Sequence, residues 1–294
     1  MDAAWAVDEE PVVGIVNSET ATGIGTEVVA DIDDESGTRS FRTDDALESV
    51  LAAHDGTAVR GDLEDVLAAT PSLLVTAGAN DLSAAARATL DVPVLPVGDV
   101  PGIETVDRDR LPAALEAVLE GDVTVERRPV LGVDLEVGDG GSGVDTTTGL
   151  LETSDDGPER ALFDVSLVTD EPARISEYSV RSRNESVASF RADGVVVATP
   201  AGSHGYASAV DTPHLSSAVD AVAVAPIAPF ATRTRRWVLP DDDVTLAVER
   251  DECDVTLVVD GRSAGTVALG CRITIGVDGT LSTLSVSDED LLDR

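Results

Sequence analysis

The sequence contains no lysine, so each of its 20 basic residues is an arginine. It has 56 acidic residues, spread along the chain, and the formal net charge is −36. An acidic excess of this size repels nucleic acids and anionic membranes, which excludes them as partners. Such a surface is typical of proteins that work in concentrated salt, where repulsion between charges is screened beyond about 3 Å at 1 M. The composition therefore predicts a halophilic host cytoplasm.

Aromatic residues and cysteines are also scarce. Aromatics make up 3% of the chain, so the core must be built from Val, Ala and Leu. The two cysteines, Cys253 and Cys271, are too few for a disulfide framework and are predicted to be buried free thiols. Residues 1–10 lack the basic region of a signal peptide. No apolar run approaches the roughly 20 residues that span a bilayer. We expect a soluble cytoplasmic protein.

Apolar runs alternate with amphipathic segments between residues 11 and 120. Strands are predicted at 12–16, 57–60, 73–76 and 92–97, and helices at 26–32, 44–54, 62–69, 81–90 and 108–119. Alternation of this kind predicts an α/β domain with a mostly parallel sheet and helices on its faces.

The pattern changes at Gly121. From there to the 270s the runs are short, rich in Val, Thr and Ser, and broken by Gly, Asp and Pro, which indicates an all-β domain of two packed sheets, a β-sandwich. Residues 138–158 read as a long polar hairpin or loop. The predicted division is an α/β domain over 1–120, a β-sandwich over 121–265, and a C-terminal segment over 266–294 that returns toward the first domain.

The stretch 193–206 carries the strongest local signal. It opens with an Asp-Gly turn, continues through Val195 to Ala198 as a buried strand, and ends in a loop of small residues. Gly202 lets the backbone approach another group, and Ser203 and Tyr206 supply hydroxyls. A flat polar ligand would suit this loop. An ordinary strand followed by an irregular turn fits the same pattern.

Other candidate motifs are incomplete. Thr22 to Gly25 supply half of a dinucleotide-binding fingerprint, without its third glycine. The glycine-rich run 138–143 is not followed by the lysine of a phosphate-binding loop. The three histidines do not have metal-ligand spacing, so no metal ligands are predicted from the residues. Of the three histidines, only His204, inside the central loop, is a candidate site residue.

The central stretch resembles the signature D-G-x-x-x-x-T-P-T-G-S-T-A-Y of NAD kinases. The run 225–230 and the later Arg236 resemble the proline-rich run and arginine that follow in that family, and Asp260-Gly261-Arg262 resembles its D-G-Q turn. The resemblance covers about residues 12–275. It implies an α/β nucleotide-binding domain, a β-sandwich substrate domain and an active site between them. It also implies transfer of the ATP γ-phosphate to the adenosine 2′-hydroxyl of NAD, giving NADP, with Mg²⁺ bridging the phosphates.

The resemblance also implies which residues bind nucleotides. Gly78 would face the ATP phosphates, and Gly202, Ser203 and Tyr206 would line the dinucleotide site. The full set implied for cofactor binding is Gly78, Asn80, Phe163, Asp164, Thr199, Gly202, Ser203, His204 and Tyr206.

Several positions depart from the family pattern. The G-G-D-G loop falls on residues 77–80, so Ala79 stands where the family has its general-base aspartate. Loss of a general base typically lowers the rate by ~10²–10⁴. Asp81 is a weak substitute, because it is expected to cap the next helix. Phe163 and Asp164 replace the family's Asn-Glu pair, and His204 replaces a threonine.

Three functions remain open from the sequence. The chain is a weak or rewired NAD kinase, a non-catalytic dinucleotide sensor or partner subunit, or a kinase of another small polyol or lipid. The missing aspartate favours the second, whereas Phe163 and His204 would suit the third. The family analogy also predicts a homo-oligomer.

Overall fold

The fold is described from a computed structural model over residues 10–16, 36–136, 159–171, 174–231, 234–251 and 253–287. The predicted helix at 26–32, the Thr22–Gly25 motif and the polar loop at 138–158 lie outside these residues.

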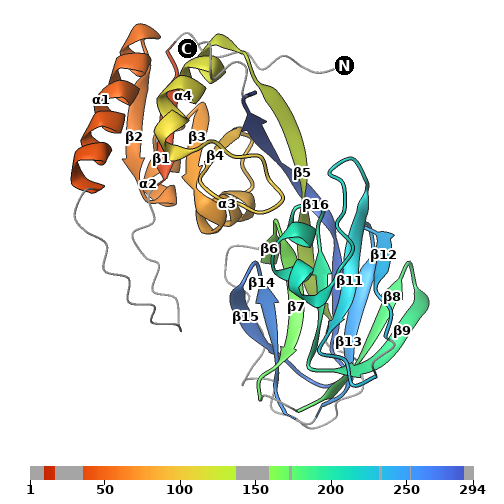
Figure 1. Ribbon diagram of the computed structural model, residues 1–294. Helices are drawn as coiled ribbons and strands as arrows, with labels where there is room; N and C mark the ends of the chain where they lie inside the picture. Colours follow the sequence, from red (N-terminus) through yellow and green to blue (C-terminus); the bar gives the residue numbers. More distant parts are fainter. Residues whose placement is uncertain are drawn as a thin grey trace.

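The N-terminal half is a parallel sheet covered by helices (Figure 1). Its elements are β1 (Val12–Val16), α1 (Ser36–Ala53), β2 (Thr57–Gly61), α2 (Leu63–Ala68), β3 (Leu73–Ala77), α3 (Gly78–Arg87), β4 (Val94–Val97), the 3₁₀ turn η1 (Arg108–Arg110) and α4 (Leu111–Glu120). The strand order is β2-β1-β3-β4, with every neighbouring pair parallel. The predicted α/β class is confirmed.

Strand β3 shows why this half folds as a sheet between helices. Leu73 and Val75 point into one apolar cluster, with residues of α1 and α4, while Leu74 points into a second, with Leu82 of α3. A strand buried on both faces reads as a continuous apolar run, which is how the sequence presents it.

The second half consists of antiparallel strands. They are β5 (Thr124–Glu136), β6 (Glu159–Ala161), β7 (Asp164–Thr169), β8 (Ser176–Ser182), β9 (Glu185–Ala192), β10 (Gly194–Ala198), β11 (Ala221–Ile227), β12 (Trp237–Pro240), β13 (Val244–Arg250), β14 (Val255–Val259), β15 (Arg262–Val267) and β16 (Arg272–Ser285); between β10 and β11 lie the 3₁₀ turns η2 (Gly202–His204) and η3 (Tyr206–Val210). One sheet has the order β12-β11-β10-β7-β14-β15, and β16-β13-β8-β9 belong to the other.

A long ribbon of β5 and β16 joins the two halves. The two strands pair from Arg272 opposite Glu136 to Ser285 opposite Thr124, and Figure 1 shows the ribbon running from the sandwich up to the helices. Near its end β16 also pairs with β4 of the parallel sheet. One hydrogen-bonded sheet therefore continues through both halves. The predicted division had a C-terminal segment returning toward the first domain, but gave no pairing of that segment with β5. The domain limits themselves stay a prediction.

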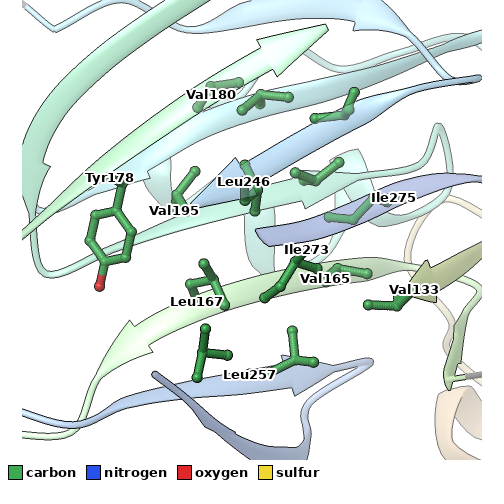
Figure 2. Packing of buried hydrophobic residues seen from close by; sticks show 14 of the residues in the cluster. Val133, Val165, Leu167, Tyr178, Val180, Val195, Leu246, Leu257, Ile273 and Ile275 are labelled. Carbon is green, nitrogen blue, oxygen red and sulfur yellow. The ribbon is translucent and has the colours of Figure 1, made fainter. Parts of the chain in front are cut away.

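The sandwich interior is mostly aliphatic, with Tyr178 and Phe190 as its buried aromatic side chains. Figure 2 shows Val195, Leu246, Leu257 and Ile273 meeting between the sheets, and all four side chains are fully buried. All five residues of β10 are buried, which confirms the predicted strand. The interior follows from a composition with few aromatics, because aliphatic side chains must supply the buried area.

Three smaller expectations have outcomes in the described residues. Cys271 is buried and Cys253 half-buried, both as free thiols. Helix α1 begins eight residues before its predicted start at Asp44. In the described ranges, each helix is too short or too polar to cross a membrane.

Candidate functional site

Helix α3 begins without a connecting loop. Gly78 has φ of 78°, and this left-handed conformation lets the chain turn from β3 directly into the helix. The predicted loop at 77–80 is therefore the end of a strand and a first helical turn. The N-cap is Ala77, so the prediction that Asp81 caps the helix is wrong. A helix start with no side-chain acceptor at its cap leaves backbone amides for an anion such as phosphate.

Ala79 lies in apolar surroundings. It is half-buried and packs against a cluster that includes Leu82 and Ala201, against which Phe163 also packs. Asp81, two residues on, is about 200° further around the helix and so leaves it on the opposite side. Its side chain is 4% exposed. Asp81 could serve position 79 only if the helix start were remodelled.

The turn between β6 and β7 is the second part of the site. The Phe163 carbonyl accepts a hydrogen bond from the Thr199 amide at 2.9 Å, and the Leu162 carbonyl accepts one from Thr199 Oγ1 at 2.7 Å. A Cβ atom placed on Gly202 would lie 1.9 Å from the Phe163 carbonyl oxygen. The loop that begins at Thr199 is therefore pressed against this turn, and only glycine fits at position 202.

Two predicted hydroxyls hold the loop in shape. Thr199 Oγ1 accepts from the Gly202 amide at 3.1 Å. Ser203 Oγ donates to the Pro200 carbonyl at 2.7 Å and accepts from the Leu215 amide at 2.9 Å. Both residues are fully buried. Their hydroxyls bond within the protein, so their predicted contact with a nucleotide stays a prediction.

Other predicted residues of the site are open to solvent. Tyr206 is 55% exposed, Asn80 is exposed at the start of α3, and His204 is exposed. A Cβ atom placed on Gly78 would meet nothing within 4 Å, so there is space beside the helix start. These four positions can be reached by a ligand.

Asp164 is a buried carboxyl group. It begins β7 opposite Ala198 of β10, and cross-strand partners share a face of the sheet. Ala198 packs against Ala207, so Asp164 lies on the face covered by η3. Burial, and secondarily the charge of Asp260, raise the pKa of Asp164 to about 7. This carboxyl group changes its charge near neutral pH and can then either donate or accept a hydrogen bond.

A cavity of about 390 Å³ adjoins the loop at Pro200 and His204. It is lined by the 102–104 segment of the N-terminal half and by Pro200, His204 and residues 215–217 of the second half, with Glu126 and Arg128 at its wall. Arg128 is buried, pairs with Glu126 and donates to the Gly102 carbonyl at 3.4 Å. Of the predicted residues, only His204 lines this cavity.

Sequence reasoning missed Asp260 as a site residue. Its carboxylate binds backbone amides of the β6–β7 turn and the hydroxyl of Ser83 on α3. Two signals were available: an Asp-Gly pair between two valine-rich runs, and the likeness of residues 260–262 to the D-G-Q turn. Both predict a turn but not its contacts. Among the described residues, no three His, Cys, Asp or Glu side chains gather as they would around a metal ion.

Known proteins share both sequence and fold with this chain. Residues 162–279 match the family model of the ATP-NAD kinase C-terminal domain. The NAD kinase of Methanosarcina barkeri is 34% identical over 112 residues, covering 38% of this chain and 41% of that protein's length. The NAD kinase of Geotalea daltonii is 27% identical over 234 residues, which is 78% of each chain.

Two solved structures have the same fold. Yeast NADH kinase complexed with NADH aligns with a TM-score of 0.70 at 16% identity, over 99% of this chain and 90% of that one. An NAD kinase from Archaeoglobus fulgidus in complex with ATP aligns with a TM-score of 0.66 at 17% identity, over 96% and 95%. These likenesses confirm the resemblance inferred from the motifs: residues 162–279 match the ATP-NAD kinase C-terminal domain, and the chain as a whole is similar to NAD kinases in sequence and in fold.

Proposed function

We propose that the chain binds NAD and ATP beside the start of α3 and phosphorylates the adenosine 2′-hydroxyl of NAD slowly, giving NADP. The observation that supports this most is that the start of α3, which has no side-chain cap, lies beside the Thr199–Tyr206 loop and the turn that carries Phe163 and Asp164. A helix start, a loop shaped by internal hydrogen bonds and a buried carboxyl group suit phosphate, sugar and base together.

The residues present fit the two nucleotides. Open space beside Gly78 lets a phosphate approach the amides of α3, and exposed Asn80 and Tyr206 offer an amide and a ring at the rim. ATP supplies the transferred phosphoryl group when it is bound. Mg²⁺ is usually held by phosphates, waters and one or two carboxylates. It therefore does not need a cluster of three acidic, His or Cys side chains, which the described residues do not form.

The slow rate follows from Ala79. A methyl group cannot accept the proton of the ribose hydroxyl, and Asp81 leaves the helix on the other side. Positioning and neutralisation of phosphate charge still favour phosphoryl transfer, so some activity remains. The same substitution favours a second candidate, a dinucleotide-binding subunit without catalysis.

A coupled assay for NADP formation in molar salt tests the proposal. The variant Ala79→Asp restores a carboxylate at the start of α3 and is expected to raise the rate by about 10²-fold or more. Asn80→Asp adds the same charge one residue away, at the rim of the same site, and serves as the matched control: it can weaken nucleotide binding but should not raise the rate.

Three outcomes separate the alternatives. Wild-type turnover in the ordinary kinase range of about 1–100 s⁻¹ would contradict the proposed loss of the base. No NADP from either protein, with NAD binding retained in calorimetry, would favour the non-catalytic subunit. Absence of NAD binding would overturn both. Assembly into a homo-oligomer, solubility in the cytoplasm and a halophilic host stay predictions.

A further inference from the structure

Asp260 occupies a tight turn between β14 and β15. Val259 pairs with Arg262, so only Asp260 and Gly261 form the connection, with φ of 47° and 75°. Two positive φ angles define the turn type that favours Asp-Gly in hairpins. The turn therefore fixes the backbone of Asp260 and directs its side chain toward the β6–β7 turn.

The carboxylate of Asp260 accepts four hydrogen bonds. Oδ1 accepts from the Phe163 amide at 2.7 Å and the Asp164 amide at 3.1 Å. Oδ2 accepts from the Leu162 amide at 2.9 Å and from Ser83 Oγ at 2.5 Å. The Asp260 amide donates back to the Asp164 carbonyl at 2.9 Å. Three consecutive amides around one carboxylate hold the turn 162–164 in a single conformation.

Ser83 extends this contact to the N-terminal half. Arg87 Nη1 donates to Ser83 Oγ at 2.7 Å, so the serine hydroxyl links a cation to the Asp260 carboxylate. Ala79, Ser83 and Arg87 are four residues apart and share one face of α3. The helix face that presents position 79 at the site is thus bonded, through Asp260, to the turn that presents Phe163 and Asp164.

The four donors occupy the acceptor directions of the Asp260 carboxylate. Asp260 is thereby suited to hold the turn and not to take a proton from a substrate. The 162–164 turn also holds the Thr199–Tyr206 loop, because the carbonyls of Leu162 and Phe163 accept hydrogen bonds from Thr199. Movement of Asp260 would displace all three parts of the candidate site.

We propose that Asp260 is a positioning residue: with Ser83 and Arg87 it forms a latch that fixes the 162–164 turn against α3 and sets the geometry of the dinucleotide site. This inference rests on the proposed function only for the identity of the ligand. The latch itself is a property of the fold.

Amide hydrogen exchange of the full chain in molar salt tests the latch directly. Asp260→Asn keeps the residue size and tolerates the left-handed backbone. It replaces one acceptor oxygen by a donor, so two of the four donors lose their acceptor. Exchange of the 162–164 amides is expected to accelerate by about 10- to 100-fold, since bonds to a charged group are lost. Asp242→Asn, which breaks an exposed ion pair with Arg183, is the matched control and should leave these amides unchanged.

Binding titrations test the positioning role. Asp260→Asn is expected to weaken NAD binding by about tenfold or more, while ATP, bound at the start of α3, loses less than about threefold. Ser83→Ala removes one arm of the latch and leaves the three amide bonds, so it should show the same selectivity with a smaller loss. A role in stability alone would weaken both nucleotides together.

The outcomes are distinguishable. Unchanged exchange at 162–164 in Asp260→Asn would overturn the latch. Faster exchange at 162–164 together with equal weakening of NAD and ATP binding, or with no weakening of either, would overturn the positioning role. The proposed function would then still stand. A wild type that binds neither nucleotide would overturn the proposed function and the positioning role together, and exchange would then decide only whether the latch exists.

Discussion

The interior of the β-sandwich and the seam between α3 and the 162–164 turn are built from different chemistry. The sandwich buries aliphatic side chains such as Leu246 and Ile273 between two sheets. The seam is held by hydrogen bonds of Asp260 to Ser83 and to the turn. Burial of apolar area is not directional, whereas hydrogen bonds fix distances and angles. The comparison indicates that the sandwich supplies stability and the seam supplies position.

The largest effect is expected in the sandwich. Leu246→Ala removes a fully buried side chain in the centre of Figure 2 and should lower the free energy of unfolding by about 2–5 kcal/mol. Val238→Ala, at a position 51% exposed on the edge strand β12, should change it by less than about 0.5 kcal/mol. Denaturant unfolding at constant salt measures both. Equal losses of unfolding free energy in the two variants would mean that burial in the sandwich does not supply the stability.

The second-largest change in stability is expected from the titration of Asp164, which lies beside the seam. Its pKa is about 7 in the folded protein and near 3.8 ordinarily, so between these values only the folded state keeps the proton. The resulting stabilisation is complete below about pH 4 and is lost as the pH rises through 7, by at most about 1.4 kcal/mol per pH unit. Asp164→Asn should therefore remove this slope and be more stable than wild type at pH 8.

The control for this titration is Asp170→Asn. Asp170 is exposed and accepts from Thr256 Oγ1 beyond the other end of β7. Unfolding of this variant, followed from pH 4 to pH 8, should keep the wild-type slope. If Asp164→Asn kept it too, the buried carboxyl group would not be the one that titrates.

The smallest change in stability is expected from an ion pair next to the seam. Arg160 pairs with Asp278 at 2.6 Å and with Thr89, next to the latch. Arg160→Gln should cost less than about 1 kcal/mol, because Asp278 is partly exposed and salt screens the pair. It should leave amide exchange at 162–164 unchanged. A loss as large as that of Leu246→Ala would mean that this ion pair supplies as much stability as a buried side chain of the sandwich.

Most of the fold could be predicted from local patterns. The alternation of apolar runs with helices gave the parallel sheet, and the four apolar residues after Gly194 gave β10. Helix α3 was predicted to begin at Asp81 but begins at Gly78, because this glycine, at positive φ, joins strand and helix without a loop. A return of the C-terminal segment toward the first domain was predicted, but its pairing with β5 was not, since pairing of strands far apart in the chain leaves no local signal.

The candidate site was predictable where a motif lies within one stretch. The Thr199–Tyr206 loop carries its own signature, but sequence cannot tell a hydroxyl that faces a ligand from one, like that of Ser203, that bonds within the loop. Asp260 could not be found as a site residue. Its partners lie between 96 and 177 residues away in the sequence, and only the tertiary structure brings them together.

Amide exchange of the wild-type chain with and without NAD tests most directly whether the seam is a nucleotide site. Saturating NAD should slow exchange in the 199–206 loop and in the 162–164 turn, and leave β8 and β9 at the far edge of the sandwich unchanged. Exchange that is the same with and without NAD, or slowed only at that far edge, would contradict the account.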